Sequence, residues 1–128
     1  MNHDRLRNTY FDLIGINSIS GNEREIASYL GDRLSSIGLD VHFSEIENIG
    51  PSIYAQLNGQ NDGPTILMIG HMDTVAVMDG WNTDPFTPII DGDKVYGLGA
   101  CDMKGGLASI LETIATIVEE NILLNGNI

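Results

Sequence analysis

The fold is decided by the stretch TILMIGHMDT, residues 65–74, in which an apolar run ends in a short polar segment. A continuous apolar run of this kind is typical of a central strand that is covered on both faces. Because residues i and i+2 of an extended backbone point the same way, His71 and Asp73 are expected to project together. In open α/β sheets ligands bind beyond the carboxyl ends of the strands, so this pair lies where a ligand would bind.

The pair has a functional and a structural interpretation. A neutral imidazole is a good zinc ligand, and a nearby carboxylate can hold its other ring nitrogen in the right tautomer. The alternative is a polar turn after a buried strand, in which Asp73 caps local backbone. The pattern His-x-Asp is too short to decide between the two by itself.

Three amphipathic helices are expected around this strand, because apolar residues recur at helical spacing in three segments. These segments are residues 6–14, 26–37 and 103–121. Gly15 and Gly38 follow the first two, as glycines that end helices often do. Ser20 and Glu23 have the spacing of a capping box, in which each side chain satisfies a free backbone N–H of the other residue.

The remaining segments predict further strands. They are residues 39–43, where apolar and polar side chains alternate, residues 53–57, and the short run 94–96. Turn signals after residue 57 predict a hairpin between strands 53–57 and 65–69, and residues 76–92 are expected to form a long loop. Helices that flank a mixed sheet define a three-layer αβα fold of the α/β class. The sheet is expected to be incomplete, because the chain ends where another strand would begin.

Composition excludes several classes of protein. The chain has 128 residues, enough for one domain, and 18 acidic against 6 basic residues give it a net charge of −12. This charge excludes a general binder of nucleic acid or of an anionic membrane surface, since both need positive charge. One cysteine cannot form an internal disulfide, and no apolar stretch reaches the roughly 18 to 20 residues of a membrane span. We expect a soluble cytoplasmic protein.

A second chemistry-bearing stretch, GLGACDMKGG at residues 97–106, joins a short strand to a helix. Lys104 is followed by Gly105 rather than Ser or Thr, so the ending of a P-loop is missing. Asp102 places a negative charge where a pyrophosphate would bind, which favours a cation, although a helix N-cap is the structural alternative for this residue. Cys101 stands beside that carboxylate and is expected to be a small buried residue rather than a nucleophile.

Three segments, taken in order, resemble one family. ILMIGHMDTV (66–75), GWNTDPFTP (80–88) and YGLGACDMKGG (96–106) are similar to the acetylornithine deacetylase, succinyl-diaminopimelate desuccinylase and aminoacylase group of dinuclear zinc amidohydrolases, metallopeptidase family 20. The resemblance implies a zinc-exopeptidase-like catalytic domain. It also implies two Zn²⁺ ions per complete active site, with Co²⁺ as a substitute.

The resemblance carries roles over to three residues of this chain. His71 matches a histidine that ligates one metal, and Asp102 matches an aspartate that bridges both. Asp73 matches a catalytic carboxylate that orients the histidine. A bridging carboxylate makes physical sense, because two divalent ions about 3.5–4 Å apart repel each other and need an anion between them.

The rest of the family's site is implied beyond residue 128. The general-base glutamate, the other metal ligands and the lid or dimerisation domain follow a helix like 103–121 in the family. Residues 1–128 are therefore expected to be the N-terminal part of a metallohydrolase catalytic domain, and to be inactive by themselves. The full-length parent is expected to be a homodimer.

The implied reaction is hydrolysis of the amide bond of an N-acyl amino acid by a deacetylase-like or desuccinylase-like enzyme of amino-acid biosynthesis. Within the same family the alternative is a metallo-exopeptidase, a dipeptidase or carboxypeptidase acting on short peptides. From a different class, the chain could be a truncated, non-catalytic remnant. No nucleic acid or membrane partner is expected.

Overall fold

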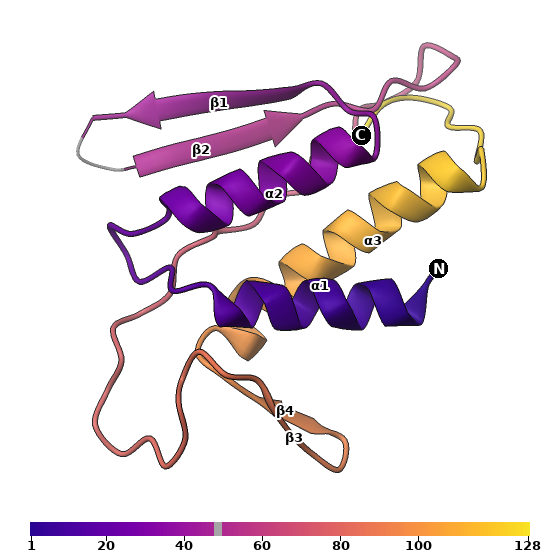
Figure 1. The fold of residues 1–128 in the computed structure, drawn as a ribbon. Helices are drawn as coiled ribbons and strands as arrows, with labels where there is room; N and C mark the ends of the chain where they lie inside the picture. Colours follow the sequence, from indigo (N-terminus) through magenta and orange to yellow (C-terminus); the bar gives the residue numbers. More distant parts are fainter. Residues whose placement is uncertain (48–49) are drawn as a thin grey trace.

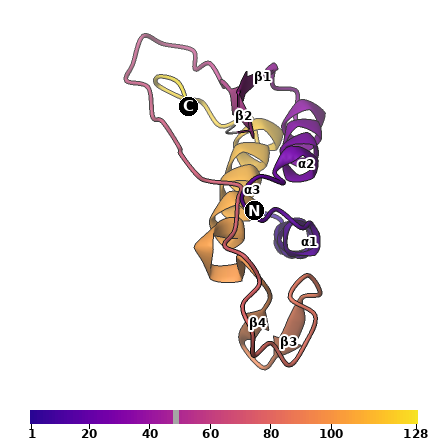
Figure 2. The same cartoon turned by 90° about the vertical axis from the view of Figure 1, so that its left-hand side faces the viewer.

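The computed structural model describes residues 1–47 and 50–128, without the side chain of Ile46. Its helices are α1 (His3–Gly15), α2 (Arg24–Ser36) and α3 (Gly105–Glu119), and a wide helical turn, Ala100–Lys104, leads into α3. Its strands form two antiparallel pairs, β1 (Val41–Ile46) with β2 (Gly50–Ala55) and β3 (Ile89–Asp91) with β4 (Lys94–Tyr96). The helices lie between the two pairs, which stand at opposite ends of the molecule (Figure 1, Figure 2).

The helices and short strands follow the sequence pattern closely. α1, α2 and α3 confirm the three amphipathic segments, and β4 confirms the strand at residues 94–96. β3 occupies residues 89–91, so the expected loop of residues 76–92 ends earlier than the sequence indicated. Within the described part of the chain, the helices are too short or too polar to cross a membrane.

The core lies where the three helices meet. Leu13 of α1, Ile26 and Leu30 of α2, and Leu107 and Leu111 of α3 are buried and form one cluster. Burial of an aliphatic side chain of this size contributes about 1.5–3 kcal/mol, so the cluster is the main apolar attachment between the helices. Helical spacing brings these residues to one face of each helix.

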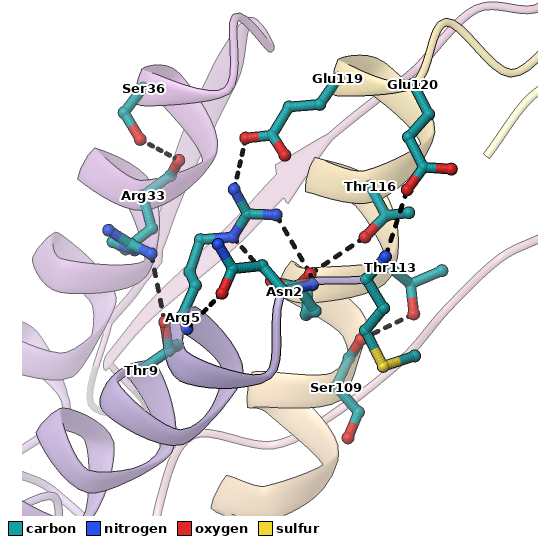
Figure 3. A network of polar contacts seen from close by, with 12 residues as sticks. Asn2, Arg5, Thr9, Arg33, Ser36, Ser109, Thr113, Thr116, Glu119 and Glu120 are labelled. Atoms are coloured by element: carbon teal, nitrogen blue, oxygen red, sulfur yellow. Dashed lines mark hydrogen bonds and ion pairs between the residues drawn. The ribbon is translucent and has the colours of Figure 1, made fainter.

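An ion-pair network joins α1 to α3 on the polar side of this core (Figure 3). Arg5 donates from Nε to the buried carboxylate of Glu112 at 2.7 Å and also pairs with Glu119. The backbone N–H of Asn2 and the hydroxyl of Thr116 donate to the same Glu112 carboxylate, at 2.6 and 3.0 Å. These contacts, led by Arg5, lower the pKa of Glu112 from 4.5 to about 2.

The expected capping box in front of α2 is wrong. Glu23 reaches back only as far as the N–H of Gly21, at 2.6 Å, and makes no side-chain cap to the helix. The hydroxyl of Ser20 donates instead to the carboxylate of Asp73, at 2.7 Å. α2 begins at Arg24 with Glu23 as its N-cap residue, so Ser20 lies three positions before the N-cap and does not cap the helix.

The expected hairpin between β2 and residues 65–69 is also wrong, because β2 pairs with β1. Leu57, just beyond β2, exchanges two backbone hydrogen bonds with Ile128, at 2.8 and 3.0 Å. Asn127 in turn forms a parallel bridge with Thr65. Residues 127 and 128 therefore lie where the hairpin would have placed 65–69. Parallel and antiparallel contacts meet here, as they do in a mixed sheet.

Residues 66–69 do not form the expected central strand covered on both faces. Leu67 and Ile69 are 77% and 75% exposed. The other side of the same segment lies on α3, since a Cβ on Gly70 would come within 2.8 Å of Leu107 and Met72 packs on the core. Within the described residues the helices cover only this side, so the second face stays open. The α/β class holds, with one helical layer seen.

Candidate metal centre

His71 belongs to the extended segment that packs on the start of α3. Gly70 allows the close approach, because any Cβ at that position would collide with Leu107. The backbone N–H of His71 points to the sulfur of Met103 at 3.2 Å. The backbone at His71 is therefore placed by contacts with Met103 and Leu107, at and just before the start of α3.

Asp102 belongs to the turn that precedes α3. Gly99 has a φ of +76°, a left-handed conformation that a side chain disfavours, and its carbonyl accepts the N–H of Lys104 at 2.9 Å. The turn directs the carboxylate of Asp102 outward, where its Oδ1 lies 2.8 Å from Nε2 of His71. Two residues that are 31 positions apart are thus brought into direct contact, as the sequence predicted.

Asp73 stands behind the imidazole, as predicted. Its Oδ1 is 3.3 Å from Nδ1 of His71, and its backbone carbonyl is 3.1 Å from the same nitrogen. Ser20 donates to the other carboxylate oxygen of Asp73 at 2.7 Å. With Asp73 accepting at Nδ1, the tautomer that carries its proton there leaves Nε2 free to accept a proton or a metal.

The charges of the site reinforce this arrangement. The pKa of His71 is raised, first by its hydrogen bond to Asp102 and then, against some desolvation, by Asp73. The pKa of Asp73 is lowered, chiefly by the hydroxyl of Ser20. The imidazole therefore lies in a negative environment. Such an environment favours a positive charge at Nε2, which either a proton or a metal cation supplies.

The side chains present fit part of a zinc site. An imidazole nitrogen and a carboxylate oxygen are donors that zinc takes, and His71 and Asp102 present one of each at the same exposed point. A catalytic zinc ordinarily has three protein ligands. Residues 1–47 and 50–128 hold no group of three or more His, Cys, Asp or Glu side chains that could bind a metal. The described chain therefore offers two neighbouring ligands of such a site.

Cys101 differs from expectation, and the histidine His42 lies outside this cluster. Cys101 is exposed, so its expected burial is wrong; the turn that directs Asp102 outward also exposes the preceding residue. His42 stacks on Tyr54 in the β1–β2 pair, with ring centroids 4.8 Å apart, and takes no part in the site.

Sequence reasoning missed two residues that support the site. Ser20 was interpreted as a helix cap, and its local pattern gave no sign of the distant Asp73. Lys104 is only 1% exposed, and its ammonium group donates to the carbonyl of Ile16 at 2.7 Å. Burial lowers the pKa of Lys104 to about 8. Nothing in the sequence around Lys104 indicates that a lysine is buried there.

Comparison with known proteins finds relatives of the chain in both sequence and fold. Residues 67–128 match the model of the family described as Peptidase family M20/M25/M40. Over 121 residues the chain is 34% identical to succinyl-diaminopimelate desuccinylase from Gluconacetobacter diazotrophicus, which covers 91% of this chain and 31% of that enzyme.

Solved structures share the fold. A tripeptidase from Staphylococcus aureus matches with a TM-score of 0.80 and 30% identity, covering 99% of this chain and 35% of the other. A dinuclear metal-binding peptidase of the M20 family from Bacillus subtilis matches with a TM-score of 0.70 over 98% of this chain and 33% of the other. At 23% identity, that likeness concerns the fold alone.

The chain spans about a third of the length of these relatives. The comparison of sequences and the comparison of structures nevertheless both find peptidases and related hydrolases. The residues that match the family model, 67–128, contain both His71 and Asp102. On both grounds, residues 67–128 match the peptidase family M20/M25/M40, and the chain as a whole resembles the N-terminal third of such enzymes in sequence and fold.

Proposed function

We propose that residues 1–128 are the N-terminal part of the catalytic domain of a zinc-dependent hydrolase that cleaves the amide bond of an N-acyl amino acid. One observation carries the proposal: His71 lies between two carboxylates, with Nε2 at 2.8 Å from Asp102 and Nδ1 at 3.3 Å from Asp73. The similarity to a succinyl-diaminopimelate desuccinylase supports a succinylated or acetylated amino acid as the substrate.

In this proposal each side chain has a separate task. Nε2 of His71 and the carboxylate of Asp102 would hold a zinc ion, and the same carboxylate would be available to a second one. Asp73 orients the imidazole and keeps the proton on Nδ1, while the hydroxyl of Ser20 holds Asp73 in place. When bound, the metal would polarise the amide carbonyl and lower the pKa of a water molecule. The general base is not assigned to any described residue.

A second candidate is a metallo-exopeptidase that acts on short peptides. The similarity to a tripeptidase, at a TM-score of 0.80, favours it specifically. Both candidates use the same two ligands, because each cleaves an amide bond beside a metal-activated water. The homodimeric state and the cytoplasmic location expected from the sequence are further parts of the proposal and concern the whole protein.

Zinc retention by the chain tests the proposal. After dialysis against buffered Zn²⁺, the chain is expected to retain zinc. His71→Ala and Asp102→Ala should each weaken retention by at least the ~10–100-fold that follows the loss of an orienting partner. His42→Ala is the matched control, since His42 is exposed and lies in the β1–β2 pair. Equal retention by the chain and by His71→Ala would remove the basis of the proposal.

A further inference from the structure

Lys104 is a buried cation at the base of the candidate metal centre. Its side chain is 1% exposed, and Nζ donates to the backbone carbonyl of Ile16 at 2.7 Å. Lysine is almost never fully buried unless its ammonium group has a partner, because removing a charge from water is unfavourable. An aliphatic side chain of similar length would fill the same space without that penalty. The ammonium group therefore needs an explanation beyond packing.

Lys104 lies where three segments of the chain meet. The first, residues 16–20, follows α1 and contains Ser20; the second, residues 73–74, contains Asp73. These two are joined by hydrogen bonds from the N–H of Thr74 to the carbonyl of Ser18, at 2.8 Å, and from the N–H of Ser20 to the carbonyl of Thr74, at 3.0 Å.

The third segment is the turn that presents Asp102. Lys104 closes this turn through its backbone N–H, which donates to the carbonyl of Gly99 at 2.9 Å. Its Cδ and Cε pack against Gly99, where an added Cβ would lie 3.2 and 3.3 Å away. The methyl group of Thr74 packs at the same point, 2.6 Å from that Cβ position. One glycine thus brings the lysine stem and the segment of Asp73 together.

The junction is polar as well as buried. The hydroxyl groups of Ser18 and Thr74 are buried and, among the described residues, have no hydrogen-bond partner. A buried hydroxyl without a partner is unfavourable, so these two groups do not hold the junction together. The hydrogen bond from Lys104 to Ile16 is a directional contact that does, and it ties the turn of Asp102 to the segment of Ser20.

We propose that Lys104 is a positioning residue, which holds Asp102 opposite His71 by anchoring the turn at residues 99–104 to the end of α1. Through Thr74 and Ser20 the same anchor keeps Asp73 behind the imidazole. The inference rests on the proposed function, in which His71 and Asp102 bind a divalent cation. Lys104 itself touches neither the cation nor a substrate. Its ammonium group makes the directional hydrogen bond to Ile16, and its aliphatic stem packs against Gly99 and sets the distance between the two segments.

The test compares Lys104→Met with Lys94→Met in the 128-residue chain. Methionine keeps much of the apolar volume and removes the donor, and Lys94 is exposed on β4, so it is a matched control. Titration with Co²⁺ is expected to show affinity weakened about 10–100-fold in Lys104→Met, with a changed visible absorption spectrum of the bound ion. Lys94→Met should leave both unchanged.

A measurement without metal keeps the two proposals separate. The ¹⁵N chemical shift of Nε2 in His71 reports its contact with Asp102, and it should move in Lys104→Met but not in Lys94→Met. If Lys104→Met does not fold, Lys104→Gln is measured instead. It keeps an N–H donor but is one atom too short for Ile16, so the same ¹⁵N shift should move.

The outcomes are distinct. A folded Lys104→Met with the Co²⁺ affinity, the spectrum and the ¹⁵N shift of the unchanged chain would overturn the positioning role. So would equal losses in Lys94→Met. If the unchanged chain takes up no Co²⁺, the proposed function fails. The ¹⁵N shift of His71 then still decides whether Lys104 holds Asp102 in place.

Discussion

Glu112 offers a direct test of what attaches α1 to α3. Its buried carboxylate accepts hydrogen bonds from four donors, which belong to Asn2, Arg5 and Thr116. These contacts lower its pKa from 4.5 to about 2. At about 1.4 kcal/mol per pKa unit, this corresponds to about 3 kcal/mol of stability at neutral pH. Glu112→Gln keeps the shape and removes the charge, so we expect it to lower the free energy of unfolding by about that amount.

The pH dependence follows from the sign of the shift. The folded-state pKa of Glu112 lies below the unfolded value, so its contribution is fully present above about pH 4.5 and is lost as the pH falls through about 2. The difference between the unchanged chain and Glu112→Gln should therefore shrink from about 3 kcal/mol at pH 7 toward zero near pH 2. Subtracting the free energy of unfolding of Glu112→Gln from that of the unchanged chain cancels the contributions of the remaining acidic residues.

Urea unfolding at several pH values, followed by circular dichroism, measures this difference. Glu120→Gln is the matched control, because Glu120 is exposed and, within residues 1–47 and 50–128, pairs only with the terminal amine of Met1, at 3.2 Å. An exposed pair of this kind contributes about 0–1 kcal/mol. The reasoning is refuted if Glu112→Gln and Glu120→Gln lose similar stability at pH 7, or if the difference for Glu112→Gln does not change with pH.

Two further predictions concern the candidate metal centre. Asp73→Ala should weaken zinc retention about 10–100-fold while Asp79→Ala leaves it unchanged, because Asp73 contacts His71 and Asp79 is exposed on the loop that follows; equal retention in both variants would contradict the orienting role. The chain by itself, assayed with Zn²⁺ or Co²⁺ on N-acetyl and N-succinyl amino acids and on tripeptides, should turn over far more slowly than about 1 per second. It lacks an assigned general base, a group that typically contributes about 10²–10⁴-fold, so turnover at an ordinary enzyme rate would show the expectation of inactivity to be wrong.

The helices could be predicted from sequence because their signal is local. A buried stripe such as Leu107 and Leu111 repeats every three or four residues, and the packing partner does not have to be known. The expected strand at residues 65–69 could not be predicted from a local signal of this kind. Its apolar run is typical of a covered strand, but coverage depends on which segments lie beside it. Here Asn127 and Ile128 take the neighbouring place, and Leu67 stays exposed.

The two central residues of the site were predictable for a different reason. His71 and Asp102 belong to specific motifs, and the resemblance placed them together although their separation along the chain gives no such indication. Ser20 was missed because its spacing to Glu23 has a sufficient local explanation. Lys104 was missed because its burial depends on the carbonyl of Ile16, 88 positions away, and a backbone acceptor leaves no mark in the sequence.

Two of the polar contacts that join the region of α1 to the region of α3 have different functions. Arg5 meets Glu112 in the middle of α3, whereas Ile16 accepts from Lys104 just before α3, two positions from Asp102. Glu112 should therefore govern stability without moving the metal ligands. Lys104 should govern their alignment. Glu112→Gln is expected to leave Co²⁺ affinity unchanged when measured well below its unfolding temperature, while Lys104→Met lowers that affinity even where it stays folded. If both variants lost affinity in proportion to stability, the site would depend on the overall packing of the helices rather than on the Lys104 contact.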